Sequence, residues 1–200
     1  MIDERILWLV PIISLIGSGR YIWLTLRGRV QPNRVTWFLW ALAPMIAFAA
    51  ELQQGVGLQS ILTFMVGFGP LLILIASFVG RRSTWKLTRF DMTCGVLSLL
   101  GLALWAVTRH GDVAIIFSIL ADGLAAVPTI VKAYRDPESE SSLVFSLACV
   151  NSLLTLATVD TWTLGHIGFP IYIFLVSAIL VLLIQFKLGT RRRSTEEKTY

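Results

Sequence analysis

The sequence predicts an all-α polytopic membrane protein in which seven transmembrane helices form two parallel three-helix repeats joined by an inverting fourth helix. Hydrophobic residues make up 56% of the 200 residues and charged residues only 14%, whereas about a quarter of a soluble domain is charged. Seven apolar stretches have lengths suited to a bilayer, and the polar residues of the first recur in the fifth. The composition therefore excludes an ordinary soluble domain.

The seven apolar stretches approach or reach the roughly 17 to 25 residues that a helix needs to cross a hydrocarbon core of about 30 Å. We expect helices at residues 6–26, 35–52, 58–79, 92–107, 113–134, 143–159 and 167–188. The connections between them are too short to hold an extramembrane domain. We therefore expect a first triple-helix repeat at 1–80, a linker helix at 81–110, a second triple-helix repeat at 111–188 and a basic cytoplasmic tail at 189–200.

Basic residues collect on one side of the predicted helices, and only Arg5 and Arg109 lie on the other side. Under the positive-inside rule this asymmetry predicts an N-terminus outside and a C-terminus in the cytoplasm. We expect the membrane to be a bacterial inner (plasma) membrane. The net charge of +5 then indicates anionic lipid at the cytoplasmic face as a partner, and no nucleic acid. The basic loops and tail hold Arg27, Arg29, Arg34, Arg81, Arg82, Lys86, Arg89, Lys132, Arg135, Lys187, Arg191, Arg192, Arg193 and Lys198.

The first and fifth helices share a pattern of polar residues when one is shifted by 104 positions. At helical spacing the polar members lie on one face of each helix. Two parallel helices would thus present matching polar stripes. The aligned pairs are Ser14 with Ser118, Ser18 with Asp122, Gly19 with Gly123, and Thr25 with Thr129.

A basic, proline-containing turn follows each of these helices, as "RGRVQPNRVTWF" and "KAYRDPESESSLVF". A shift of 105 residues aligns Pro32 with Pro137 and Thr36 with Ser141, and each hydroxyl is placed to cap the next helix. The spans therefore group as three, one and three, with the fourth helix making both triplets run the same way. Parallel repeats of this kind place a substrate site near the midplane, between the triplets.

This layout, with the run "PTIVKAYRDPESESS" closing the fifth helix, resembles the PQ-loop and SWEET superfamily of small-solute transporters. Pro128 and Thr129 stand at the place of the family's proline-glutamine pair, and the first triplet has Leu24 and Thr25 there. The third helix of each triplet lacks the embedded asparagines that line the family's sugar pocket. The resemblance thus implies a transporter that moves a small polar metabolite by rocking of the two triplets, without implying a sugar.

Asp122 lies roughly 14 Å from the outer end of its helix at helical rise, close to the midplane. An ionised carboxylate at this depth is costly, so we expect Asp122 to face protein or water, to bond a donor, or to stay protonated. A carboxyl that alternates between these states suits proton coupling. The alternative is a permanent hydrogen bond that joins two helices. Asn151 is expected near Asp122, where it either binds substrate or donates to the acid.

Arg20 is the other charge within a predicted span, about 10 Å from the inner end of the first helix. It either pairs with Asp122 or extends to the cytoplasmic headgroups. A permanent pair would weaken the proton-coupling hypothesis. Ser18, Thr25 and Thr129 complete the expected polar pathway.

Three prolines and an aromatic face complete the candidate site. Pro44, Pro70 and Pro128 each remove a helical hydrogen bond, so they serve either as hinges or as ordinary prolines of membrane helices. Trp37, with Trp40 adjacent, suits a planar ligand, core packing or a lipid-facing belt.

The sequence gives little support to an enzyme, and we assign no catalytic residue, cofactor or metal. His110 and His166 are isolated, and no hydrolase, metalloprotease or phosphate-binding motif occurs. The leading hypothesis is an alternating-access transporter of a small solute, proton-coupled through Asp122. The alternatives are a receptor or assembly subunit of the same fold, and an intramembrane enzyme; any of these can form a homo-oligomer. A hydrated cavity between the first and fifth helices would favour transport.

Overall fold

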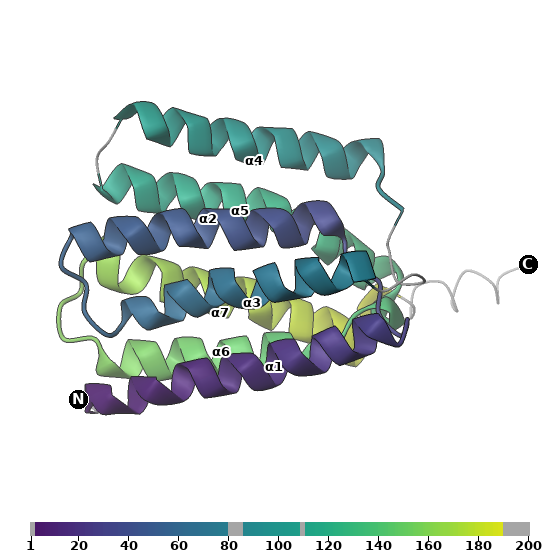
Figure 1. Cartoon of the computed structure of the whole chain (residues 1–200), viewed down its shortest axis with the longest axis horizontal. Helices are drawn as coiled ribbons and strands as arrows, with labels where there is room; N and C mark the ends of the chain where they lie inside the picture. The colour runs from purple at the N-terminus through teal and green to yellow at the C-terminus, as the bar shows by residue number, and fades with distance from the viewer. Residues whose placement is uncertain (1–2, 80–85, 109–110, 190–200) are drawn as a thin grey trace, which may run out of the picture.

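The computed structural model describes residues 3–79, 86–108 and 111–189, and within these ranges it is all α-helical with no strand (Figure 1). Each predicted apolar stretch forms one helix, with ends shifted by three residues or fewer. Two short 3-10 helices, η1 at Glu4–Trp8 and η2 at Pro137–Ser139, precede α1 and α6. The α-helices are α1 Leu9–Leu26, α2 Arg34–Gln53, α3 Ser60–Val79, α4 Arg89–Thr108, α5 Gly111–Arg135, α6 Ser142–Thr158 and α7 Leu164–Phe186.

Five helical segments of the described chain are long and apolar enough to cross a membrane. α6 is apolar but shorter. Arg81, Arg82 and Arg109 lie outside the described residues, as does the predicted tail beyond Gly189. The five spanning segments are Glu4–Leu26, Arg34–Gln53, Ser60–Val79, Ile115–Arg135 and Leu164–Phe186.

The helices pack so that α3 lies between α1 and α2, while α7 lies between α5 and α6. α1 also contacts α6, and α2 contacts α5. Figure 1 shows α4 at one edge of the bundle, against α5, and shows the start of η1 and the end of α7 at opposite ends. We call these the N-terminal end and the C-terminal end of the bundle.

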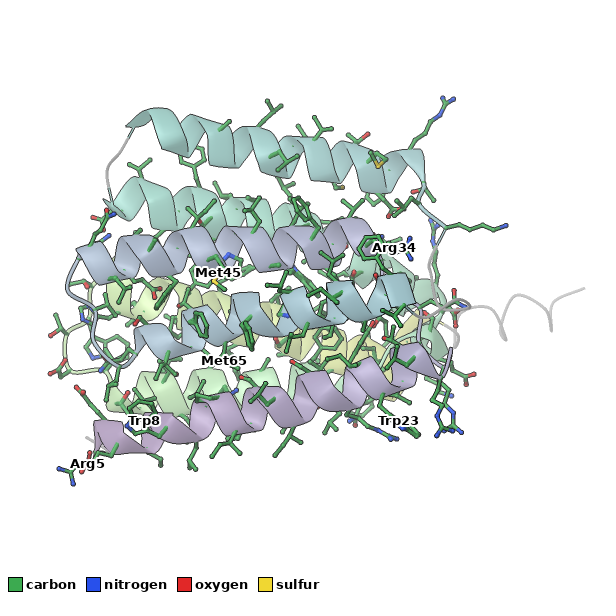
Figure 2. The ribbon with its side chains drawn as sticks, viewed as in Figure 1. Arg5, Trp8, Trp23, Arg34, Met45 and Met65 are labelled. Carbon is green, nitrogen blue, oxygen red and sulfur yellow. The ribbon has the colours of Figure 1, made fainter. Side chains whose placement is uncertain are left out.

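The distribution of polarity is that of an integral membrane protein. Trp8 at the end of η1 and Ile12 and Ile16 of α1 point outward, each more than half exposed, while α1 buries Ser18 and Thr25. Figure 2 shows Trp8 and Trp23 near opposite ends of this helix, where interfacial tryptophans are expected. Apolar side chains on the outside are stable only against lipid or another apolar surface.

The residue that caps the start of α2 is Asn33, and not Thr36, which the sequence suggested as a capping hydroxyl. The Oδ1 atom of Asn33 accepts hydrogen bonds from the backbone amides of Val35 and Thr36, which have no partner within the helix. Its Nδ2 donates to Asp91 in the first turn of α4 over 3.0 Å. An asparagine is favoured here because one side chain caps one helix and joins it to another.

Candidate functional site

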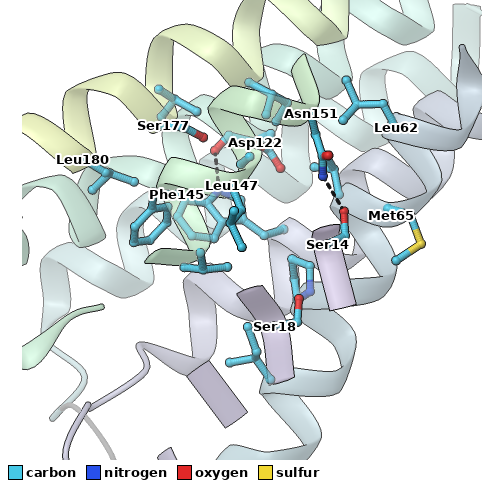
Figure 3. A pocket seen from close by; sticks show the side chains of 18 of the residues that line it. Ser14, Ser18, Leu62, Met65, Asp122, Phe145, Leu147, Asn151, Ser177 and Leu180 are labelled. Atoms are coloured by element: carbon cyan, nitrogen blue, oxygen red, sulfur yellow. Dashed lines mark hydrogen bonds between the residues drawn. The ribbon is translucent and has the colours of Figure 1, made fainter. Parts of the chain in front are cut away.

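A cavity of about 90 Å³ lies in the middle of the bundle, where α1, α2, α3, α5, α6 and α7 meet (Figure 3). Its polar lining comes from Ser14 and Ser18 of α1, Asp122 of α5, Asn151 of α6 and Ser177 of α7. The rest of the lining is mainly apolar and aromatic. A volume of this size holds several water molecules, and the polar groups supply the partners that buried water requires.

Asp122 is 1% exposed and is bonded on one side only. The Tyr172 hydroxyl on α7 donates to Asp122 Oδ2 over 2.6 Å. Oδ1 is buried and has no hydrogen-bond partner within the described chain. A buried carboxyl oxygen without a donor is destabilising unless water or a ligand supplies one. The sequence left open whether this acid would face protein or water, bond a donor or stay protonated, and it did not identify Tyr172 as the donor.

Asn151 does not donate to Asp122. Its Nδ2 donates to Ser14 Oγ over 2.8 Å and to the Val10 carbonyl over 3.4 Å, so it joins α6 to α1. Figure 3 shows the Ser14 bond as a dashed line across the cavity wall. The Oδ1 atom of Asn151 is buried without a partner among the described residues. Asn151 therefore presents a free acceptor in the wall that also holds Asp122.

Arg20 lies on the outer surface of α1 and does not pair with Asp122. Its guanidinium carbon is 4.6 Å from the centre of the Trp23 ring, three residues further along the helix. The side chain therefore extends toward the C-terminal end of the bundle, as expected for an arginine that reaches for headgroups. Arg20 is not part of the cavity, and the pair that would have weakened proton coupling is absent from the described chain.

The other candidate residues divide between the cavity wall and the surrounding core. Ser18, Trp37 and Pro70 line the cavity. Thr25 and Thr129 are fully buried away from it, and their hydroxyls have no hydrogen-bond partner within the described chain. The two threonines thus do not join the cavity wall.

Helices continue through all three candidate hinge prolines: Pro44 in α2, Pro70 in α3 and Pro128 in α5. A fourth proline, Pro170, lies inside α7. Each proline leaves the carbonyl one turn earlier without its helical donor, so each of these four helices can bend there.

An aromatic cluster borders the cavity toward the C-terminal end of the bundle. The rings of Tyr21 and Trp37 lie 4.8 Å apart, Trp37 and Trp40 lie 5.2 Å apart, and Trp40 and Phe145 lie 6.1 Å apart. Trp40 Nε1 donates to the backbone carbonyl of Asp122 over 3.3 Å. These rings connect α1, α2, α5 and α6 on one side of the cavity.

A buried polar network lies beyond these rings. Glu140, in the turn before α6, accepts from the Tyr21 hydroxyl over 2.6 Å and pairs with Lys132 of α5 over 2.5 Å. Lys132 also donates to the Gln31 carbonyl in the turn after α1. The Gln31 amide in turn donates to the carbonyl of Ser139 over 3.1 Å. Lys132 is only 1% exposed, so its assignment to a basic loop is wrong.

Another buried acid, Glu51, was not singled out from the sequence. It lies in the last turn of α2, is 1% exposed and accepts a 2.9 Å hydrogen bond from the Thr63 hydroxyl of α3. Its position at the end of an apolar stretch resembles an ordinary boundary charge. Tyr172 was not singled out either, because the sequence does not show which residue a tyrosine within an apolar helix bonds.

Comparison with protein-family models, curated proteins and solved structures gives no match for this chain.

Proposed function

We propose that this chain transports a small polar solute by alternating access of two triple-helix halves, with Asp122 at the solute or proton site. The halves are α1 to α3 and α5 to α7, and α4 joins them as an additional transmembrane helix. The N-terminus lies outside a bacterial inner membrane and the C-terminus lies in the cytoplasm, in accordance with the basic residues at that end. The Asp122 cavity is the observation that carries the proposal.

The helix contacts support the two related halves because they occur in matching pairs. The contacts of α1 with α3 and of α2 with α3 correspond to those of α5 with α7 and of α6 with α7. Exchanging the halves also turns the contact between α1 and α6 into that between α5 and α2. Such pairs are expected of two units related by a twofold axis along the membrane normal.

The sequence of the third helix in each half supports the same relation. A shift of 100 residues aligns "PLLILIAS" at 70–77 with "PIYIFLVS" at 170–177, matching a proline, an isoleucine and a serine. Ile73 and Ile173 both line the cavity. Trp40 and Phe145, aligned at the shift of 105, contact each other, as equivalent residues do beside a twofold axis. The cavity thus lies where the proposed axis passes between the halves.

The wall chemistry favours a neutral or cationic solute that carries hydrogen-bond donors. Asp122 Oδ1 and Asn151 Oδ1 are both acceptors without a donor within the described chain. None of the cavity-lining residues in the described ranges is a lysine or arginine that would attract an anion. Trp37 and Trp40 add aromatic faces, which attract cations and cover flat apolar surfaces.

The aromatic cluster and the network of Lys132 and Glu140 form a closure on the cytoplasmic side of this cavity. The network joins the turn after α1 to the turn before α6, which belong to opposite halves. Rocking of the halves would have to separate these turns. Buried contacts with two discrete arrangements are what alternating access requires of a gate.

Alternating access can be tested without knowing the solute, through a cysteine at Ser18. We would replace the native Cys94 and Cys149, introduce Ser18→Cys, and treat sided membrane vesicles with a membrane-impermeant thiol reagent. A transporter should become labelled from both sides of the membrane. An Ala126→Cys control, buried in the core outside the cavity, should resist the reagent. Labelling from a single side would favour a receptor or an assembly subunit instead.

Transport itself would be measured in liposomes that contain the purified protein and a trapped pH dye, with sugars, amino acids and small organic cations supplied outside. We expect one solute class to enter together with protons and Asp122→Asn to abolish this entry. Asp112→Asn, which alters an exposed acid at the start of the same helix, is the matched control. Undiminished entry in Asp122→Asn would remove this acid from the mechanism.

A further inference from the structure

We propose that Arg20, Arg27 and Arg29, gathered around Trp23, form a binding site for the phosphate of an anionic phospholipid. The site lies on the outer surface at the C-terminal end of α1, away from the central cavity. It is independent of transport, so either proposal can fail without the other.

Three guanidinium groups converge on one ring. Their central carbons lie 4.6, 5.1 and 5.6 Å from the centre of the Trp23 ring, for Arg20, Arg27 and Arg29 respectively. Attraction to the negative faces of the indole holds these cations near one another. Trp23 itself is 38% exposed, so the cluster is open to its surroundings.

The cluster lacks a neutralising partner. Within the described chain no carboxylate pairs with Arg20, Arg27 or Arg29, and no hydrogen bond of their guanidinium groups occurs. Because all three guanidinium carbons lie within 5.6 Å of one ring centre, these cations repel one another over distances comparable to the screening length of about 8 Å at physiological salt. An anion placed between them would relieve the repulsion and accept bidentate hydrogen bonds, for which guanidinium and phosphate geometries match.

The surroundings favour a lipid over a free anion. Leu15, Ile16 and Leu26 are each about half exposed on α1, so an apolar surface adjoins the arginines. Arg20 arises about 10 Å inside the end of the helix, at the depth of acyl chains, and its side chain reaches outward along the helix. A phospholipid matches the apolar surface and the arginine cluster together, because its chains cover the apolar surface while its phosphate binds the guanidinium groups. Inorganic phosphate would bind the guanidinium groups only.

The test uses the full chain, purified in detergent and supplied with equal amounts of phosphatidylglycerol and phosphatidylcholine, with retained lipids counted by native mass spectrometry. We expect the unaltered protein to prefer phosphatidylglycerol. Each arginine near an anionic surface contributes about a fivefold preference for anionic lipid. The preference for phosphatidylglycerol should therefore be about fivefold lower in each single glutamine variant. The triple variant R20Q/R27Q/R29Q should retain both lipids equally.

Two controls keep the result specific. Arg89→Gln removes an exposed charge at the same end of the bundle, on α4, and should leave the preference unchanged. A triple lysine variant retains the charges but loses the bidentate geometry. Its preference for phosphatidylglycerol should therefore lie between those of the unaltered protein and the triple glutamine variant. Unfolding midpoints of all variants would establish that they are folded.

Three outcomes would overturn the proposal. An equal preference in the triple glutamine variant and the unaltered protein would assign the lipid to other basic residues. If Arg89→Gln lowers the preference for phosphatidylglycerol as much as a single glutamine variant of the cluster does, net charge alone would explain the preference. Displacement of phosphatidylglycerol by millimolar inorganic phosphate would show a site for free anions and not for a lipid.

Discussion

The hydroxyl of Tyr172 donates a 2.6 Å hydrogen bond to one carboxyl oxygen of Asp122, and the other oxygen is buried without a partner in the described chain. The bond joins α7 to α5. An acid held in this way has a fixed position and an unused acceptor. Such an acceptor is suited to a proton, a water molecule or a solute.

Tyr172→Phe should lower stability because it removes the donor and keeps the ring. Leaving a buried acceptor unsatisfied costs about 1–3 kcal/mol, which should appear as a lower midpoint of thermal unfolding in detergent. Tyr134→Phe, which removes a hydroxyl from a side chain that is 37% exposed, is the control. Equal midpoints of thermal unfolding for the two variants would mean that the hydrogen bond from Tyr172 to Asp122 does not contribute to stability.

The bond between Asn151 and Ser14 should contribute a measurable coupling between α6 and α1. We expect Asn151→Ala and Ser14→Ala to be non-additive in the free energy of unfolding by about 0.6 kcal/mol, a typical value for polar bonds between membrane helices. The coupling would be measured in a double-mutant cycle. Strict additivity would indicate that Asn151 acts only through its second bond, to the Val10 carbonyl.

The sequence predicted the helices well because the length of an apolar stretch is a local property that a bilayer-spanning helix must satisfy. Helical periodicity also predicted that Ser18 and Asp122 face inward, and both line the cavity. It could not predict Tyr172 as the donor, because that bond depends on how α7 packs against α5. Nor could it predict the burial of Lys132, because its partner Glu140 returns to it only through the fold of the turn before α6.

Two glycines should respond with opposite signs to the same replacement by alanine. A Cβ atom at Gly67 would lie 3.0 Å from Met45 Cγ and 3.1 Å from the Ala41 carbonyl oxygen, whereas one at Gly19 meets nothing within 4 Å. Gly67→Ala should therefore force α3 away from α2 and destabilise the fold by about 1–3 kcal/mol. Gly19→Ala should stabilise α1 by up to about 1 kcal/mol, since alanine has the higher helix propensity. Unfolding midpoints that move in the same direction would contradict the close approach of α2 and α3.

Two Lys–Glu pairs among the described residues provide a comparison between burial and exposure. Lys132 and Glu140 are at most 1% exposed, while Lys187 and Glu138 are 53% and 78% exposed. Glu140→Gln should cost about 3–5 kcal/mol, because it removes the carboxylate that faces the buried Lys132 ammonium. Glu138→Gln should lower the unfolding midpoint far less at neutral pH, because water and salt screen an exposed pair. If the two variants unfold at the same midpoint, Lys132 and Glu140 do not form a closed gate.

The exposed pair also predicts a weak dependence on pH, with a definite sign. The hydrogen bond from Lys187 lowers the pKa of Glu138 below its usual value. Since the pKa of Glu138 is lower in the folded than in the unfolded protein, any stabilisation from the pair is present above the unfolded pKa and is lost as the pH falls through the folded one. The difference in midpoint between unaltered protein and Glu138→Gln should thus shrink toward zero on acidification. A difference that grows as the pH falls would mean that protonated Glu138 makes the stronger contact, against the geometry of a carboxylate facing an ammonium.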